Sequence, residues 1–182
     1  MFKKIEPLSK NTHQNLRFDK ISGYEFAKNI TSSPVSASEF LQASRYYPVV
    51  FPVDGAAPLV LFALNQKTNL YVNGDGSWKV PYIPAHIRRY PFVFANSDKK
   101  DQEKNTYVFC IDREAPHFAA DQGEPMFTAN GDLSDISQNA MNFLEKFQSE
   151  LTVTQTLCKE LDDKEVLVAK EVNFEKDGKK SK

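Results

Sequence analysis

One stretch limits the fold more than any other, because glycines and prolines interrupt it at short intervals. It runs from Asn69 to Phe94 and reads NLYVNGDGSWKVPYIPAHIRRYPFVF. The segment Asn73–Gly76 tolerates the positive φ values of a tight turn, so it predicts a hairpin after the β-rich run Leu70–Val72. The return strand carries Trp78 and Val80, which are one residue apart and therefore lie on one face.

Three prolines shape the segment after the hairpin. Pro81 and Pro84 cannot donate a ladder hydrogen bond, so strand pairing stops there. Pro84 suits the first position of a short helical turn, which we predict over Ala85 to Arg89. Pro91 ends that turn because it disfavours the α conformation at the residue before it. The segment Phe92–Ala95 is too apolar to alternate, which predicts a fully buried strand.

Length and composition predict one domain over residues 1–182. A chain of 182 residues with a hydrophobic fraction of 41% can bury a core. Lysine plus arginine number 23 against 24 for aspartate plus glutamate, so a net charge of -1 provides no basic field for nucleic acid. The 14 Phe and 7 Tyr favour a packed core over a disordered chain.

Neither a membrane segment nor a metal motif is visible in the sequence. The N-terminus has two lysines with no apolar segment behind them, and no later run approaches the roughly 18 residues of a membrane span. We therefore expect no membrane span and, by sequence, a cytoplasmic protein. Cys110 and Cys158 show no CxxC spacing, which favours buried free thiols over a disulfide or a zinc site. No cofactor and no metal are expected.

The first part of the chain predicts loops and one helix. Loop-forming residues separate short apolar pieces in residues 1–34, which we interpret as a lead-in segment that packs against the domain. Ser36 and Glu39 form a capping-box pattern, so a helix is expected from Ser36 to about Arg45.

The middle of the chain predicts an antiparallel sheet. Apolar runs bounded by turn residues indicate strands at Tyr47–Pro52, Pro58–Leu64 and Tyr107–Ile111. Connections of two to five residues are too short for parallel crossovers, so the strands form a meander. We expect this sheet to be built from Val49 to Ile111.

A long amphipathic helix is expected in the second half of the chain, from Ser134 to Leu161. Residues 112–132 are rich in Pro, Gly and acids and read as an irregular connection. Mostly apolar residues then recur at steps of three and four: Ile136, Ala140, Phe143, Leu144, Phe147, Leu151, Thr154, Leu157, Cys158 and Leu161. With this helix covering one face of the sheet, the fold class is α+β.

The C-terminal region indicates a strand and a turn. Glu165–Phe174 is a β-type run, and Asp177–Gly178 is a hairpin-turn dipeptide within the polar tail 175–182. No second strand is evident after this turn, which suggests a chain that is cut short and predicts that Val166–Phe174 forms an unpaired edge strand. The alternative is a frayed polar tail.

Three residues of the central stretch could bind an anion. His86 could act as a base beside Arg88 and Arg89, whose guanidinium groups suit phosphate and carboxylate. The alternative is structural: one arginine pairs with a carboxylate at the edge of the core and the other is solvated.

The aromatic residues of the same stretch are a second candidate. Trp78, Tyr82 and Tyr90 could stack on a sugar or on a side chain of a partner, and the alternative is burial in the core. Other patterns are weaker. Cys110, Asp112 and His117 could mimic a nucleophile, acid and base, but Cys110 lies within an apolar strand.

Several ordered pieces of this chain are similar to a known family. They are Tyr47–Phe51, Asn69–Val72, Gly76–Trp78, Tyr82–Phe92, Cys110–Asp112 and Gly123–Phe127. In these pieces the chain resembles the bacterial SapC family, named for a protein of a surface-layer (S-layer) operon. The resemblance implies an association with S-layer systems and supplies no catalytic residue. SapC-like chains usually continue through a second strand and a C-terminal helical segment, which agrees with a truncated chain.

These observations give two hypotheses of function. The first is a non-enzymatic S-layer-associated or accessory binding protein that uses the Trp78 to Tyr90 region. Its partners are S-layer or other cell-surface components, which it would reach by a non-classical export route. The second is a small-molecule enzyme or enzyme accessory protein that uses His86, Arg88 and Arg89. A deep pocket where these three converge favours the enzyme, and a shallow aromatic surface favours the binding protein.

Overall fold

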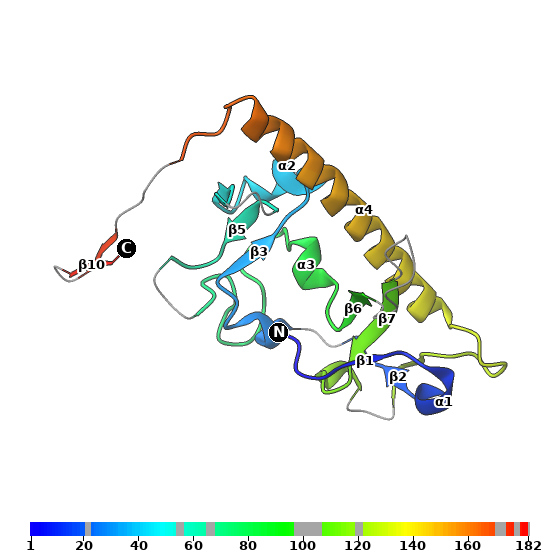
Figure 1. The fold of residues 1–182 in the computed structure, drawn as a ribbon. Coiled ribbons are helices and arrows are strands. Elements are labelled where there is room, and N and C mark those ends of the chain that lie inside the picture. The colour runs from blue at the N-terminus through cyan, green and yellow to red at the C-terminus, as the bar shows by residue number, and fades with distance from the viewer. Residues whose placement is uncertain are drawn as a thin grey trace.

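The computed structural model describes residues 1–20, 23–53, 57–64, 68–96, 107–118, 122–169, 174–176 and 179–181. These residues form small antiparallel sheets and one long helix, α4 (Asp135–Asp163), which runs along one side of the molecule (Figure 1). The predicted α+β class, with antiparallel pairing and a long helix in the C-terminal half, is confirmed.

The first sheet joins the N-terminus to the middle of the chain. Its order is β1 (Ile5–Pro7), β7 (Tyr107–Asp112) and β6 (Phe92–Asn96), and both pairings are antiparallel. β6 and β7 are two of the apolar runs predicted as strands. Because β1 comes from residues 1–34, the lead-in segment supplies an edge strand as well as packing contacts.

The second sheet has the order β3 (Ser32–Pro34), β5 (Leu59–Leu61) and β4 (Val49–Val50). The predicted strands Tyr47–Pro52 and Pro58–Leu64 are present as β4 and β5, which pair antiparallel as expected. Both are shorter than predicted because the prolines that bracket them cannot donate ladder hydrogen bonds.

The structure divides the predicted sheet from Val49 to Ile111 into these two sheets. The hairpin between them is reduced to an isolated bridge between Val72 and Trp78. Gly76 supplies the positive φ that the turn requires, at 82°. Since Pro81 comes soon after the bridge, pairing cannot extend further, and the chain crosses to the first sheet without a regular strand.

Short helical turns connect the strands. In chain order they are α1 (Lys10–His13), η1 (Glu25–Ala27), η2 (Ala37–Glu39), α2 (Phe40–Ala43), α3 (Ala85–Arg88) and η3 (Pro116–Phe118). The capping box predicted from Ser36 and Glu39 is present at the start of η2. The helix expected to reach about Arg45 consists of η2 followed by α2. A further antiparallel pair joins β2 (Arg17–Phe18) and β8 (Glu124–Pro125).

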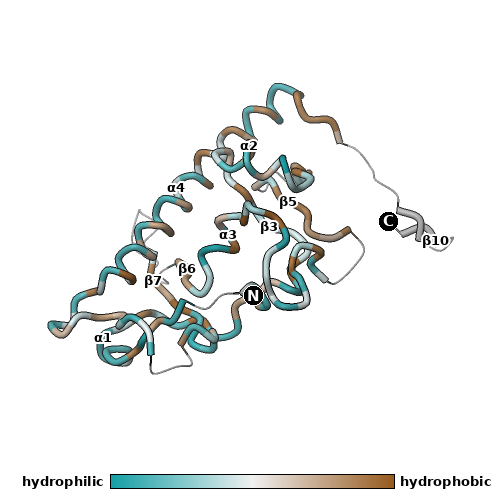
Figure 2. The backbone as a smooth tube through the Cα atoms, turned by 180° about the vertical axis from the view of Figure 1, so that it is seen from behind, coloured by the Kyte–Doolittle hydropathy of each residue, from teal (hydrophilic) through white to brown (hydrophobic). Residues whose placement is uncertain are grey.

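Helix α4 closely matches the predicted Ser134–Leu161, with Ser134 as its N-cap. It lies against β6 and η2. Leu144 and Phe147 face the body and are 2% and 3% exposed, whereas Val153 is 65% exposed. Figure 2 shows hydrophobic and hydrophilic residues alternating along α4, as expected for a helix that buries one face.

The described core has two clusters. One lies around the first sheet and includes Phe92, Ile111 and Leu144, and the other lies around the second sheet and includes Val60 and Ile87. In both clusters, aromatic rings from different parts of the chain contact one another. These contacts bury a large apolar area. The two cysteines are buried and free, as predicted, and burial raises the pKa of each thiol.

The C-terminal region differs from the predictions. Residues 166–169 lie outside any strand, so the predicted strand Val166–Phe174 is wrong in this part, and residues 170–173 lie outside the described residues. β9 (Phe174–Lys176) pairs antiparallel with β10 (Lys179–Ser181), which provides the second strand that the sequence did not suggest. The turn dipeptide Asp177–Gly178 lies outside the described residues. The paired strands lie apart from the two sheets (Figure 1).

Candidate functional site

Helix α3 places two adjacent arginines between the two clusters. Pro84, which was predicted at the first helical position (N1), is instead the N-cap of this turn, and Ala85 is the first helical residue. Ile87, with no exposed surface, anchors the turn in the second cluster, while Tyr90 is 6% exposed and packs in the first. Arg88 and Arg89, between these anchors, are therefore held at the junction.

The arginines line a cavity of about 460 Å³, termed here the basic cavity. Its wall combines rings and aliphatic groups from four parts of the chain with a few polar side chains. The lining residues used below are Lys20, Phe26, Arg88, Arg89, Tyr90, His117, Ala140 and Phe143. Phe26 comes from the lead-in segment and Phe143 from α4, so the cavity exists only in the folded chain.

Arg89 is largely buried and lies near two aromatic rings. Its guanidinium carbon lies 5.5 Å from the ring centre of Phe2 and 5.8 Å from that of Phe147, within cation–π range. Its Nε is buried and has no hydrogen-bond partner among the described residues. Burial lowers the pKa of Arg89 to about 10.

Arg88 is exposed and lines the same cavity. Its Nε donates to the Ile83 carbonyl at 2.9 Å, and its guanidinium carbon lies 5.2 Å from the ring centre of Phe143. Within the described part of the chain, neither Arg88 nor Arg89 forms an ion pair with a carboxylate. The structural alternative, in which one arginine pairs with a carboxylate at the core edge, is therefore not found among these residues.

His117 and Tyr90 belong to the aromatic lining of the basic cavity. The His117 ring stacks on Phe18 with centroids 5.3 Å apart, and its side chain is almost fully buried. Its Nδ1 has no hydrogen-bond partner in the described ranges. Burial lowers the pKa of His117 to about 4, so the ring is neutral near pH 7. The Tyr90 ring stacks on Phe26 at 4.1 Å.

Asp112 has a structural role next to this wall. Its carboxylate is fully buried and accepts hydrogen bonds from the Lys3 and Lys4 amides at 2.9 Å and from Tyr90 Oη at 3.2 Å. No described hydrogen bond joins it to His117. The nucleophile, acid and base suggested by Cys110, Asp112 and His117 are not assembled, because the carboxylate ties down the N-terminal segment instead.

His86 is absent from the wall of the basic cavity. Its ring packs against Phe147 with centroids 6.2 Å apart. Burial, and secondarily the charge of Arg89, lower the pKa of His86 to about 3. The convergence of His86 with both arginines in one pocket, which the enzyme hypothesis expects, is therefore not present.

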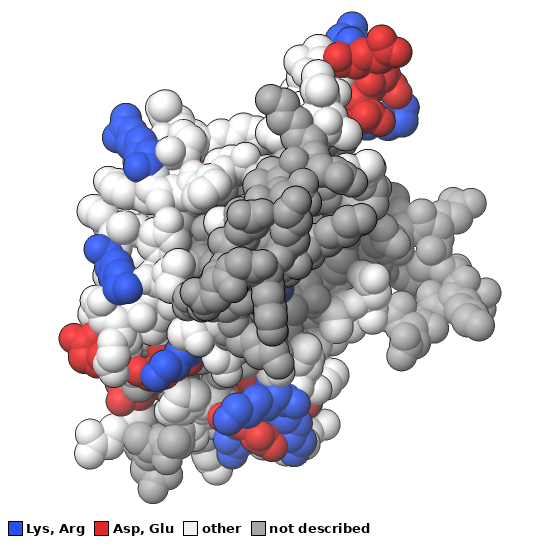
Figure 3. All heavy atoms as spheres, turned by 90° about the vertical axis from the view of Figure 1, so that its left-hand side faces the viewer, with Lys and Arg blue, Asp and Glu red and all other residues white. Residues whose placement is uncertain are grey.

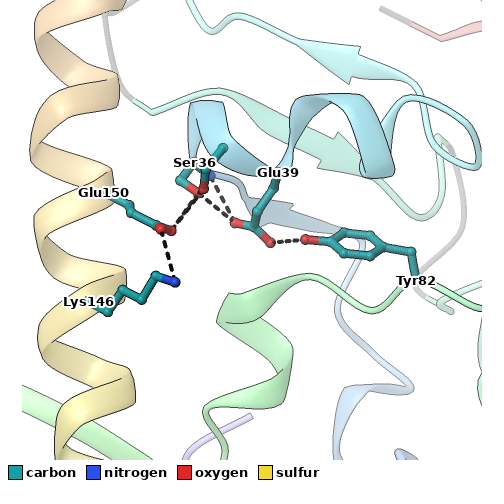
Figure 4. A network of polar contacts seen from close by, with 6 residues as sticks. Ser36, Glu39, Tyr82, Lys146 and Glu150 are labelled. Carbon is teal, nitrogen blue, oxygen red and sulfur yellow. Dashed lines mark hydrogen bonds and ion pairs between the residues drawn. The ribbon is translucent and has the colours of Figure 1, made fainter.

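Tyr82 belongs to a polar network that joins η2 to α4 (Figure 4). Its hydroxyl donates to Glu39 Oε1 at 2.7 Å, and the same oxygen accepts the Ala85 amide at 2.8 Å. Glu39 Oε2 accepts the Ser36 amide at 3.0 Å. Glu150 of α4 accepts the Ser36 hydroxyl at 3.3 Å. Burial, together with the Glu39 carboxylate, raises the pKa of Tyr82.

Trp78 lies outside the basic cavity and lines a separate cleft. Its Nε1 donates to Tyr47 Oη at 2.8 Å, and its ring packs edge-on against Phe62 and Tyr24 with centroids 5.4 Å apart in each pair. The cleft has a volume of about 610 Å³, and Tyr24 lines both this cleft and the basic cavity. Of the six predicted site residues, the structure thus brings Arg88, Arg89 and Tyr90 together in one cavity.

Sequence reasoning missed several residues of the cavity wall. The sequence pointed to His117 only as a base for Cys110 and to Phe143 only as part of the apolar stripe. Phe26 belongs to the short apolar pieces of the lead-in segment, to which no role in a site was assigned. No local pattern links these positions, because they meet through tertiary packing. The single available signal was the aromatic content of the lead-in segment.

Neither sign of charge dominates the described part of the face that Figure 3 presents. Figure 3 shows basic and acidic side chains intermixed on the described part of this face. Among the described helices, none is sufficiently long and apolar to cross a membrane. The described residues hold no group of three or more His, Cys, Asp or Glu side chains placed to bind a metal ion.

Comparison with known proteins gives one result. No curated protein and no solved structure matches the chain. The family model of SapC matches residues 8–182, a range that contains every lining residue of the basic cavity. On this match, the chain belongs to the SapC family.

Proposed function

We propose that this SapC-family chain is a non-enzymatic binding protein that receives a ligand, or a group of a partner, in the basic cavity. The observation that carries the proposal is Arg89, a largely buried guanidinium with no described acidic partner, at the wall of an apolar cavity of about 460 Å³. A cavity of this size lies within the range of about 300–1,000 Å³ typical of small-molecule sites.

The charge of Arg89 is uncompensated in the described structure. A buried charge without a paired opposite charge is costly, and rings near the guanidinium offset only part of that cost. A bound anion would complete the pairing. Perturbed ionisable groups in a concave site are typical of functional positions, which supports this interpretation of Arg89.

The composition of the wall supports binding over covalent catalysis. Its described lining contains no Ser, Thr, Cys, Asp or Glu that could serve as nucleophile or carboxylate base, and His86 lies outside it. The S-layer or other cell-surface role follows from family resemblance, so we propose that the natural ligand belongs to such a component.

The proposal is tested with a neutral aromatic dye, 1-aminoanthracene, whose fluorescence rises in apolar cavities. The folded chain is expected to bind it saturably at one site. Ala140→Phe, which places a ring in the wall, should weaken binding by about tenfold or more. Leu41→Phe, at a position that is 69% exposed on α2, is the matched control and should bind like the wild type. Equal binding by both variants, or no binding by the wild type, would refute the proposal.

A further inference from the structure

We propose that the ligand of the basic cavity is a small hydroxyaryl carboxylate, that is, an aromatic ring that carries a carboxylate at one end and a hydroxyl at the other. This inference rests on the proposed function and specifies the chemistry of its ligand. It is drawn from three features of the wall: unpaired cations, stacked rings and one buried histidine nitrogen.

The cations require an anion. Lys20, Arg88 and Arg89 line the cavity, and the described lining includes no acidic side chain. The guanidinium of Arg88 contacts only neutral groups among the described residues, the Ile83 carbonyl and the Tyr82 side chain, and the Nε of Arg89 has no described hydrogen-bond partner. Planar guanidinium groups match the two oxygens of a carboxylate, and the bond is stronger in an apolar site than in water. A carboxylate is therefore favoured at the Arg88–Arg89 end.

The rings require a flat apolar body. Phe26 and Tyr90 are stacked at 4.1 Å, and Phe143 closes the wall from α4. Aromatic faces and edges favour other aromatic rings over polar groups. The volume of about 460 Å³ accommodates a ligand of one or two rings, whereas a polymer would need an extended groove.

His117 provides selectivity for a hydroxyl. Its Nδ1 is buried and unpartnered among the described residues, and it belongs to a ring in the same wall. A neutral imidazole nitrogen either donates or accepts, depending on the tautomer, and a phenol hydroxyl can do both. A phenol can therefore pair with Nδ1 in either tautomer, and a hydrogen bond to a nitrogen that is buried and unpartnered in the free protein adds to the binding energy.

The test is calorimetric titration of the full chain with 3-(4-hydroxyphenyl)propionate. Saturable one-to-one binding is expected. The amide of the same acid should bind about tenfold more weakly or worse, because it lacks the charge that pairs with the arginines. Arg89→Gln should lose a similar factor, whereas Arg45→Gln removes the same charge at an exposed position outside the cavity and should leave affinity within about twofold.

The hydroxyl is tested separately. Removing it, with 3-phenylpropionate, should weaken binding to the wild type by about threefold to tenfold. In His117→Phe the two acids should bind equally. Circular dichroism melts of each variant confirm that it is folded before titration, and His117→Gln serves as a second variant if His117→Phe does not fold.

The outcomes separate this inference from the proposed function. Binding of 1-aminoanthracene without any preference for the acid over its amide would refute the ligand class and leave the cavity as a binding site. Failure of both the dye and the acid would refute both proposals. Equal affinities of the two acids for the wild type would refute the role of His117.

Discussion

At the scale of single residues, a fully buried carboxylate and a partly buried guanidinium have opposite surroundings. Asp112 is fully buried, yet four described groups donate to its carboxylate: the amides of Lys3, Lys4 and Glu114 and the hydroxyl of Tyr90. Arg89 has rings around it and no described acceptor. Asp112 is thus a structural charge, whereas Arg89 carries a cost in the free protein that only a ligand would remove.

This contrast predicts that Arg89→Met does not harm the unliganded fold. Methionine keeps the packing against Phe2 and Phe147 and removes the buried charge, so the free energy of unfolding should rise by roughly 1 kcal/mol. Urea denaturation measures the change. A loss of more than about 2 kcal/mol would contradict it and indicate that the cation–π contacts dominate.

The histidines predict a loss of stability in acid. In the folded chain the pKa is about 3 for His86 and about 4 for His117, below the usual 6.5. Both lowered values mean that the unfolded state binds protons first as the pH falls below about 6.5. Each group contributes up to about 1.4 kcal/mol per pH unit of lost stability until its folded pKa is reached.

Urea midpoints measured from pH 8 to pH 4.5 check this linkage. His86→Gln should reduce the acid slope of unfolding free energy by about half, because one of the two linked protons is removed. The difference in stability between His86→Gln and the wild type above pH 7 measures the direct effect of the substitution on packing. A variant with the wild-type slope would show that His86 is protonated in the folded chain.

Variants of Trp78 and Arg88 distinguish a recognition role of this region from a packing role. Trp78 donates to Tyr47 and packs on Phe62, so Trp78→Ala should cost about 3–5 kcal/mol. Arg88 is exposed, so Arg88→Ala should change stability by less than about 0.5 kcal/mol. Thermal melts of the two variants measure both effects. Large destabilisation by both would end the hypothesis that this region is a recognition surface.

At the scale of elements, the sequence predicted what depends on neighbours along the chain. The capping box of Ser36 and Glu39 and the periodicity of α4 are local patterns, and both are found. The third partner of Glu39, the Tyr82 hydroxyl, is remote in sequence and had no local signature. The run from Val166 has strand-forming residues, yet residues 166–169 are irregular because no neighbouring strand pairs with them in the described structure.

The buried face of α4 gives a quantitative prediction. Phe147 is 3% exposed, so Phe147→Ala should cost about 3–5 kcal/mol through lost burial and a residual cavity. Val153→Ala, on the same helix but 65% exposed, should change stability by less than about 0.5 kcal/mol. Chemical denaturation of the pair compares the two faces. Similar losses would mean that the exposed face of α4 is covered in solution.

At the scale of the whole molecule, the candidate site was only half predictable. Arg88, Arg89 and Tyr90 adjoin in sequence, so a local pattern could group them. Phe2 and Phe147, whose rings both lie near the Arg89 guanidinium, come from distant parts of the chain. Their meeting depends on the edge pairing of β1 with β7, and no spacing rule encodes a contact between segments so far apart.

The pairing of β1 with β7 cannot form until most of the chain has been synthesised. The Lys3 amide and its acceptor Asp112 are 109 positions apart, so the N-terminal strand leaves the ribosome long before its partner has been made. At about 5–20 residues per second, this interval lasts roughly 5–20 s. During that time β1 has no strand to pair with, so Ile5 stays accessible to chaperones that bind short apolar segments.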